Sequence, residues 1–353
     1  MHPASVTEAG DESAPTHGLS LRPIGPFGAC RQYNRNMRPR YVWQLRSRNL
    51  KLGKRTLIMG VINVTPDSFS DGGDFLAPAK AVERGLRMLD DGADILDLGG
   101  ESTRPGAPVA AGGSNAARPV VTAPVVTAEE ELRRIMPVLQ GILRARPDAL
   151  ISVDTYKAAV ARAAVGEGAE IVNDVSAFQW EPDMACACAE LQCGVVLMHT
   201  RGQPQQWRDL PPETNITTLV EHDLANRLQV AFERGVQRSR VVLDPGFGFG
   251  KNFEENYPLL AQLEQLQRLG FPLLAGTSRK SFVGRTVGKR AGHDAAVTER
   301  LYGSLAAMVA SILRGAHIVR VHDVKPAVEA AAVADEVLAA GEDRRDAGLP
   351  TVW

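Results

Sequence analysis

The stretch Met59-Gly-Val-Ile-Asn-Val-Thr-Pro-Asp-Ser-Phe-Ser-Asp-Gly-Gly73 begins as an apolar run and changes within a few residues into a polar segment rich in turn formers. Residues 56–64 are rich in Leu, Ile, Val and Met, which is typical of a strand buried on both faces of a parallel sheet. Pro66 and the pair Gly72-Gly73 prevent the strand from continuing. The stretch therefore predicts a strand that delivers Asn63 to a loop at its carboxyl end.

The same design, an apolar run that ends in Asp, Asn, His or Arg, recurs along the chain. Further strands are predicted at 93–100, 150–154, 170–175, 195–199, 241–244, 272–277 and 318–322. Helical segments separate and follow them, at 78–90, 128–146, 156–166, 183–193, 216–235, 253–269, 298–314 and 325–340. Eight strand and helix units within about 300 residues predict an α/β fold, the (β/α)8 TIM barrel. A doubly wound open sheet is the alternative.

The regular alternation does not extend over the whole chain. Residues 1–51 mix Pro, Gly, Ser, Arg and Asn without periodicity, which predicts a weakly ordered N-terminal extension. The barrel is expected at 52–345 as a single catalytic domain, followed by a C-terminal tail at 346–353. Within the barrel, residues 107–127 form a low-complexity run of Ala, Val, Gly and Pro that predicts a long loop.

Composition excludes several classes of function. Lys and Arg number 40 against 41 Asp and Glu, for a net charge of −1, which argues against nucleic acid as a partner. No run approaches about 18 uncharged apolar residues, and the N-terminus lacks the order of a signal peptide, so a cytoplasmic protein without a membrane partner is expected. Cys186, Cys188 and Cys193 lack the paired spacing of a zinc site, which favours buried thiols.

Polar residues follow every predicted strand, and a closed barrel would bring them to one face, where barrel enzymes carry out their chemistry. Any one of them is explained equally well as a helix cap or a strand end. Eight polar strand ends together favour a site. The residues are Asn63, Asp97, Thr103, Arg104, Asp154, Asn173, Asp174, His199, Asp244, Ser278, Arg279, Lys280, Arg320, His322 and Asp323.

The charges in this set are sorted along the chain, which indicates two subsites. Lys280, Arg320 and His322 follow the seventh and eighth strands, where barrels often hold phosphate, and they predict an anion. Asn63 offers a neutral oxygen ligand for an accompanying Mg²⁺. The middle strands end in acceptors and amides, which suit a flat heterocycle that carries several N–H groups. These residues are Asp154, Asn173 and Asp244.

The glycine-rich segment Asp244-Pro-Gly-Phe-Gly-Phe-Gly-Lys251 is not a phosphate-binding P-loop. Its glycine spacing differs, and Asn252 stands where Ser or Thr would hold the metal ion. The glycines instead favour a backbone that approaches a planar ligand, with Phe247 or Phe249 as an apolar wall.

Several motifs together carry a family resemblance. They are Asn63-Val-Thr-Pro-Asp-Ser-Phe-Ser-Asp-Gly-Gly73, Gly99-Gly-Glu-Ser-Thr-Arg-Pro-Gly106, Ser152-Val-Asp-Thr155, Asn173-Asp174, Asp244-Pro-Gly-Phe-Gly-Phe-Gly-Lys251, Ser278-Arg-Lys280 and Arg320-Val-His322. In this order they resemble the dihydropteroate synthases, pterin-binding enzymes of folate biosynthesis that sulfonamides target. The resemblance covers about residues 56–340 and leaves two departures, the N-terminal extension and the run at 107–127, which looks like an insertion in the second loop.

The resemblance implies a transferase that condenses 6-hydroxymethyl-7,8-dihydropterin pyrophosphate with p-aminobenzoate, with Mg²⁺ as cofactor and a homodimer as the assembly. It implies pterin binding by Asp154, Asn173, Asp244 and Lys280 beside Met198 and Phe249. It implies pyrophosphate and Mg²⁺ binding by Asn63, Arg320 and His322, and p-aminobenzoate binding by Thr103, Pro105, Ser278 and Phe69. Asp71 and Arg104 match residues of the family's mobile loops that close over the site.

Two other functions fit part of this pattern. A folate- or cobalamin-dependent methyltransferase barrel shares the pterin pocket but needs no pyrophosphate site, so the cations at 278–280 and 320–322 argue against it. A non-catalytic pterin-binding paralogue is expected to lose Asn63, Arg320 or His322, and all three are present.

Overall fold

The computed structural model describes residues 1, 38–65, 76–103 and 125–346. Four of the expected site residues lie outside the described residues, namely Phe69, Asp71, Arg104 and Pro105. The same holds for most of the expected extension, for residues 107–124 of the low-complexity run and for the tail from residue 347.

Eight parallel strands form the centre of the described chain. They are β3 (Leu57–Asn63), β4 (Ile95–Gly99), β5 (Ile151–Asp154), β6 (Ile171–Asp174), β7 (Gly194–Met198), β8 (Val241–Asp244), β9 (Leu274–Ala275) and β10 (Ile318–Val321). Their order is β8-β7-β6-β5-β4-β3-β10-β9, and a parallel bridge between Leu243 and Leu273 joins the two ends. The sheet is therefore a nearly closed TIM-like barrel, which confirms the predicted fold and excludes the open-sheet alternative.

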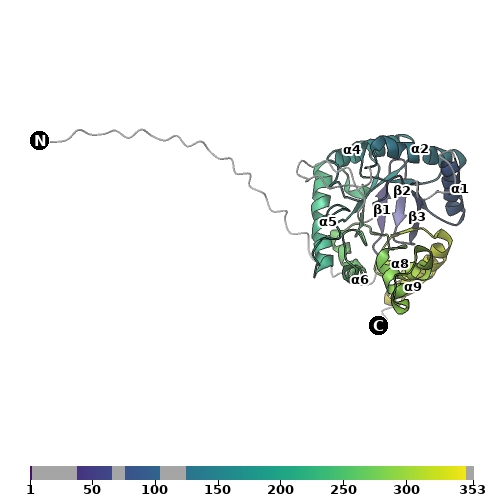
Figure 1. Cartoon of the computed structure of the whole chain (residues 1–353), viewed down its shortest axis with the longest axis vertical. Helices are drawn as coiled ribbons and strands as arrows, with labels where there is room; N and C mark the ends of the chain where they lie inside the picture. Colours follow the sequence, from purple (N-terminus) through teal and green to yellow (C-terminus); the bar gives the residue numbers. More distant parts are fainter. Residues whose placement is uncertain (2–37, 66–75, 104–124, 347–353) are drawn as a thin grey trace. The chain divides into compact units, whose positions relative to one another are not determined.

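Helices follow the strands and surround them (Figure 1). They are α1 (Leu76–Asp90), α2 (Ala128–Ala145), α3 (Ala158–Gly166), α4 (Met184–Leu191), α5 (Ile216–Glu233), α6 (Phe253–Ala261), α7 (Ser281–Gly288), α8 (Leu301–Leu313) and α9 (Val324–Asp346). Two details differ from the prediction. The expected helix at 253–269 continues after Ala261 as a 3-10 segment, and α7 was not expected. None of the described helices is long and apolar enough to cross a membrane.

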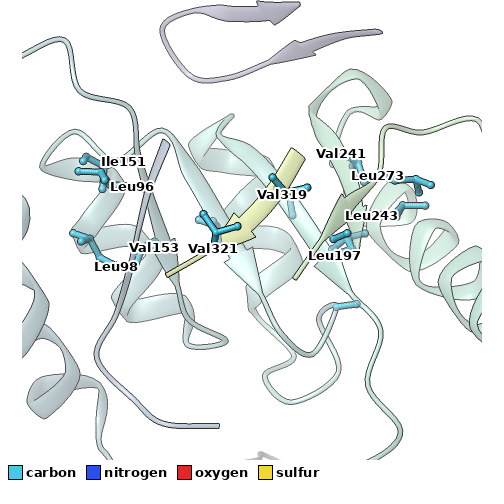
Figure 2. Close-up of a cluster of buried hydrophobic side chains, with 14 of the residues drawn as sticks. Leu96, Leu98, Ile151, Val153, Leu197, Val241, Leu243, Leu273, Val319 and Val321 are labelled. Carbon is cyan, nitrogen blue, oxygen red and sulfur yellow. The ribbon is translucent and has the colours of Figure 1, made fainter. Parts of the chain in front are cut away.

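Successive residues of each strand alternate between two environments, as the twofold repeat of a β-strand requires. One set of residues packs outward against the helices and forms the large apolar core, part of which is drawn in Figure 2. The other set points into the barrel. There Ile95, Ile171, Val242 and Ile318 belong to an apolar cluster toward the amino ends of the strands. Two residues later the interior positions are polar: Asp97, Asn173, Asp244 and Arg320. This step from apolar to polar places the site at the carboxyl end.

A β-hairpin belongs to the apolar cluster inside the barrel. Strands β1 (Tyr41–Gln44) and β2 (Asn49–Leu52) pair antiparallel, and Trp43, Leu45 and Leu52 join that cluster. A Cβ added at Gly194 would overlap Leu45, so β7 begins with the one residue that lets the hairpin approach. Residues 38–51, for which the composition predicts a weakly ordered extension, are thus packed against the barrel.

The indole of Trp43 anchors this hairpin. Trp43 is 1% exposed, and its Nε1–H donates to the carbonyl of Arg240 at 2.7 Å. We expect Trp43→Phe to lower the free energy of unfolding by about 1–2 kcal/mol, because the carbonyl loses its donor while most of the apolar contact remains. Denaturant unfolding measures the loss. Val42→Ala, at the neighbouring exposed position, should change stability by less than about 0.5 kcal/mol. Equal losses in both variants would contradict a specific role for the indole.

Candidate active site

The structure brings most of the predicted residues to one end of the barrel. Asn63 ends β3, Asp154 ends β5, Met198 ends β7 and Asp244 ends β8. Further members lie in β6, in β10 and in the segments that follow β4, β8, β9 and β10: Asn173, Arg320, Thr103, Phe249, Ser278, Lys280 and His322. Convergence of strand ends in a barrel explains why residues far apart in the sequence meet here.

Arg320 links three strands at the centre of the site. Its Nε donates to Oδ2 of Asp97 and its Nη2 donates to Oδ2 of Asp154, both at 2.6 Å. The Asn173 amide donates to the same Asp97 oxygen at 3.1 Å. The two predicted subsites are therefore not separate. Arg320, which is predicted to bind the anion, pairs with Asp154, which is predicted to bind the heterocycle.

Burial shifts the ionisation of the carboxylates at the strand ends. It raises the pKa of Asp154 to about 7, against the opposing charge of Arg320, and Asp97 and Glu131 add to the rise. Burial also raises the pKa of Asp244 to about 6, although the backbone N–H of Gly246 donates to it at 2.7 Å. Both groups therefore titrate close to neutral pH, which is common for residues that bind or transform a substrate.

An aromatic wall borders the carboxylates. Met198, Tyr156, Val175 and Trp180 form a small apolar cluster, and Phe249 packs against it. The ammonium of Lys280 lies 3.9 Å from the centroid of the Phe249 ring, a cation–π contact. Burial and the nearby Arg320 lower the pKa of Lys280 to about 8. The arrangement suits a flat, polar ring held between apolar faces and hydrogen-bonding edges.

Ser278 and His322 meet across the ends of β9 and β10. The Ser278 Oγ accepts from the backbone N–H of His322 at 3.2 Å and lies 3.1 Å from Nδ1 of the ring. A serine proton donated to Nδ1 puts the ring proton on Nε2. Burial, followed by the charge of Arg320, lowers the pKa of His322 to about 3, so the ring is neutral at pH 7. His322 therefore acts as a neutral hydrogen-bonding group and not as the cation that the sequence suggested.

Four of the predicted polar residues serve the fold instead. Asp174 accepts from the backbone N–H groups of Ser176 and Phe178, so it organises its own loop. His199 pairs with Asp223 on α5 at 3.1 Å. Arg279, with a positive φ of 58°, makes a two-pronged ion pair with Asp323 at 2.5 and 3.0 Å and joins the loops after β9 and β10.

Asn63 lies where oxygen atoms from two strands gather. A Cβ added at Gly99 would lie 3.8 Å from Oδ1 of Asn63 and 3.6 Å from Oδ2 of Asp154, so both oxygens lie close to Gly99. Among the described residues no group of three or more His, Cys, Asp or Glu side chains is arranged to hold a metal ion. One or two protein oxygens are what Mg²⁺ uses when water and substrate phosphates complete its shell. The residues present fit Mg²⁺ bound together with a phosphorylated substrate.

One member of the site was not assigned a role from the sequence. Asp97 is 0% exposed, and only one of its carboxylate oxygens is paired, since Oδ1 has no partner among the described residues. The signal was present in the alternation of β4, because Asp97 stands two residues after the interior Ile95. An Asp at an interior barrel position requires a partner, and Arg320 provides it.

Fold and site together define a class. The geometry, with carboxylates, an amide and cations at the carboxyl ends of the barrel strands, suits an enzyme for a flat heterocycle next to an anion, and a family model described as pterin binding enzyme matches residues 59–322.

Comparison with known proteins refines that class. The dihydropteroate synthase of Synechocystis is 41% identical over 283 residues, which cover 80% of this chain and 90% of the relative. The structure of the Xanthomonas albilineans dihydropteroate synthase with 4-aminobenzoic acid is 40% identical, with a TM-score of 0.72, and covers 85% of this chain and 98% of that chain. The same enzyme in complex with 7,8-dihydropteroate is 38% identical, with a TM-score of 0.70 and the same coverages. This chain belongs to the dihydropteroate synthase family of pterin-binding transferases.

Proposed function

We propose that the chain condenses 6-hydroxymethyl-7,8-dihydropterin pyrophosphate with p-aminobenzoate, which gives 7,8-dihydropteroate and pyrophosphate. The observation that carries this proposal is the adjacency of carboxylates and cations around Arg320, which pairs with Asp97 and Asp154 at 2.6 Å. The two relatives solved with 4-aminobenzoic acid and with 7,8-dihydropteroate support it.

The pterin binds among the interior residues of the middle strands. Asp154 and Asp244 accept from its N–H groups, and the Asn173 amide offers both a donor and an acceptor. Met198 and Phe249 cover the faces of the pterin. Lys280, which lies over the Phe249 ring, is placed at the edge of the pterin. A pocket of this kind discriminates against analogues that lack the N–H groups, because its buried carboxylates would stay unpaired.

The difficult step is cleavage of the bond between the pterin methylene carbon and the pyrophosphate oxygen. Arg320 carries a permanent positive charge and His322 donates a hydrogen bond, so both stabilise the charge that develops on the leaving oxygen. Asn63 would hold Mg²⁺, which supplies further positive charge to the pyrophosphate when it is bound. The electron pair of the carbon–oxygen bond leaves with pyrophosphate, and the ring stabilises the cationic methylene carbon in an SN1-like path.

The second substrate needs little activation. The amine of p-aminobenzoate is uncharged and nucleophilic at neutral pH, so it attacks the methylene carbon and then loses its proton without a strong general base. Thr103 and Ser278, with Phe69 and Pro105, surround p-aminobenzoate in this proposal, and Asp71 and Arg104 belong to the loops that exclude water.

Release of pyrophosphate tests the function. The protein is mixed with both substrates and Mg²⁺, and we expect pyrophosphate and dihydropteroate in equal amounts, with loss of activity on chelation of the metal ion. Binding of the pterin without pyrophosphate release would support the non-catalytic paralogue. Methyl transfer from a folate without pyrophosphate release would support the methyltransferase barrel.

We also propose a homodimer through α8 and α9. The outward side of α8 is apolar at Tyr302, Ala306, Val309 and Leu313, and Tyr302 is 82% exposed. Helix α9 packs beside α8 and adds Val333, which is 67% exposed. Apolar side chains gathered on adjacent helices are the usual sign of a protein interface, and a second copy of the chain is the partner that the family resemblance implies.

Tyr302→Glu tests this interface. A charge in the centre of an apolar contact is expected to weaken association by at least about tenfold, and light scattering coupled to gel filtration measures the mass. Val125→Asp places a charge on an apolar residue outside these helices and should leave the mass unchanged. A dimer of unchanged affinity in Tyr302→Glu would exclude this face.

A further inference from the structure

A buried group of charges lies beside the site but was not part of its predicted residues. Lys157 follows Asp154 by three positions, and its Nζ donates to Oε2 of Glu101 and, at 2.6 Å, to Oε2 of Glu131 on α2. The side chains of Lys157, Glu101 and Glu131 are 5%, 5% and 1% exposed. The Tyr156 hydroxyl donates to the second Glu101 oxygen at 3.3 Å. Two carboxylates thus share one ammonium in a nearly dry environment.

The two carboxylates hold different parts of the chain. Glu131 is fixed in the first turn of a long helix, whereas Glu101 lies in the segment that follows β4. The preceding Gly100 is itself held against α2, because Arg134 donates to its carbonyl at 2.7 Å and an added Cβ would crowd Glu131 and Ile135. Glu101 is therefore the last buried, ion-paired residue before Ser102 and Thr103.

The same cluster also borders the aromatic wall. Lys157 Nζ lies 4.4 Å from the centroid of the Tyr156 ring, and Tyr156 packs edge-on against Trp180 with ring centroids 5.1 Å apart. Burial raises the pKa of Glu101, against the opposing effect of Lys157, and the charge of Glu131 adds to the rise. Because one ammonium faces two carboxylates, the fold does not need both of them for charge balance.

We propose that Glu101 is a positioning residue for the second substrate: through Lys157 it fixes the segment after β4 so that Thr103 meets p-aminobenzoate. The inference rests on the proposed function and extends it to a residue that touches neither substrate. The expected effect falls on p-aminobenzoate, since Glu101 lies on the segment that leads to Thr103, whereas Asp154 and Asp244 are held by hydrogen bonds from Arg320 and from the backbone of Gly246.

A matched pair of variants tests the proposal in the full-length protein. Glu101→Met and Glu131→Met each replace a buried carboxylate with a side chain of similar size, and each leaves Lys157 one ion pair. Steady-state pyrophosphate release gives KM for each substrate. In Glu101→Met we expect KM for p-aminobenzoate to rise about tenfold, which corresponds to about 1.4 kcal/mol. KM for the pterin pyrophosphate should stay within about twofold in both variants, and Glu131→Met should leave KM for p-aminobenzoate within about twofold.

The melting temperature separates positioning from general stability. A role in stability alone would move the melting temperature of both variants and neither KM selectively. Equal rises in KM for p-aminobenzoate in the two variants, or none in Glu101→Met, would overturn the proposal. Glu101→Gln, which keeps an acceptor oxygen, provides the same comparison if Glu101→Met does not fold, with a smaller expected rise. Failure of the proposed function is recognised separately, since the wild-type protein would then release no pyrophosphate.

Discussion

Arg320→Ala is expected to lower kcat for pyrophosphate release by at least about tenfold, which corresponds to about 1.4 kcal/mol of transition-state stabilisation. The guanidinium is the charge at the centre of the site, and no other cation pairs with both Asp97 and Asp154 among the described residues. Charge that develops on the leaving pyrophosphate would lose its principal stabilising group. Unchanged turnover would contradict the assignment of Arg320 to the anion.

The same substitution should also destabilise the fold by about 3–5 kcal/mol, because it leaves the fully buried Asp97 without its ion pair. Stability and catalysis must therefore be measured apart. The double variant Arg320→Met with Asp97→Asn removes the guanidinium and the charge of Asp97 and fills the space of the arginine stem, while Asp154, the second partner of Arg320, remains. Because burial raises the pKa of Asp154 to about 7, this carboxyl can take up a proton, and we expect denaturant unfolding of the double variant to recover most of the lost stability while kcat remains low. Recovery of kcat together with stability would mean that Arg320 acts on the fold alone.

The barrel strands were predictable because a strand buried on both faces leaves a continuous apolar run. The predicted 93–100 and 318–322 contain β4 and β10 as the structure has them. The hairpin at 41–52 was not predictable in this way. Its strands carry Gln, Asn and Lys beside the apolar residues, and its burial depends on contact with β7 some 140 residues later, as Gly194 shows.

Helix α7 shows a second limit. Gly284 and Gly288 lower the helical propensity of 281–288, so local preference argues against a helix. Packing requires both glycines, since an added Cβ would overlap Arg300 at the first position and the carbonyl of His293 at the second. Tertiary contacts therefore decide the conformation of this segment against its own propensity.

The sequence predicts which residues belong to the candidate site, but it does not predict which of their side chains pair with one another. Residue type and position at a strand end identified Asp154, Asn173 and Arg320. Which of them meet depends on side-chain reach across the barrel, so the pairing of Arg320 with Asp97 had no local signal. The neutral state of His322 also follows from burial and from neighbouring cations, which the sequence does not display.

Asp154→Asn is expected to weaken binding of 6-hydroxymethyl-7,8-dihydropterin pyrophosphate by about 1.5–3 kcal/mol, or roughly 10- to 100-fold in Kd. Oδ2 of the carboxylate also accepts from Arg320, and both carboxylate oxygens are acceptors only, whereas the amide has one oxygen and presents a competing donor to the pterin N–H groups. Arg320 keeps its partner Asp97, so the substitution should not leave a buried charge unpaired. Calorimetry measures Kd, and wild-type affinity would contradict the heterocycle assignment.

The pH dependence of pterin binding distinguishes the loss of a direct contact with Asp154 from a general disturbance of the site. Burial raises the pKa of Asp154 to about 7, so the accepting carboxylate is populated above that pH and lost as the pH falls below it. Wild-type affinity for the pterin should accordingly decrease between pH 8 and pH 6, and Asp154→Asn should lose this part of the dependence. Asp174→Asn makes the same chemical change in β6, where the carboxylate bonds its own loop, and should keep the wild-type pH profile. A profile that flattens in both variants would mean that the dependence arises elsewhere in the barrel.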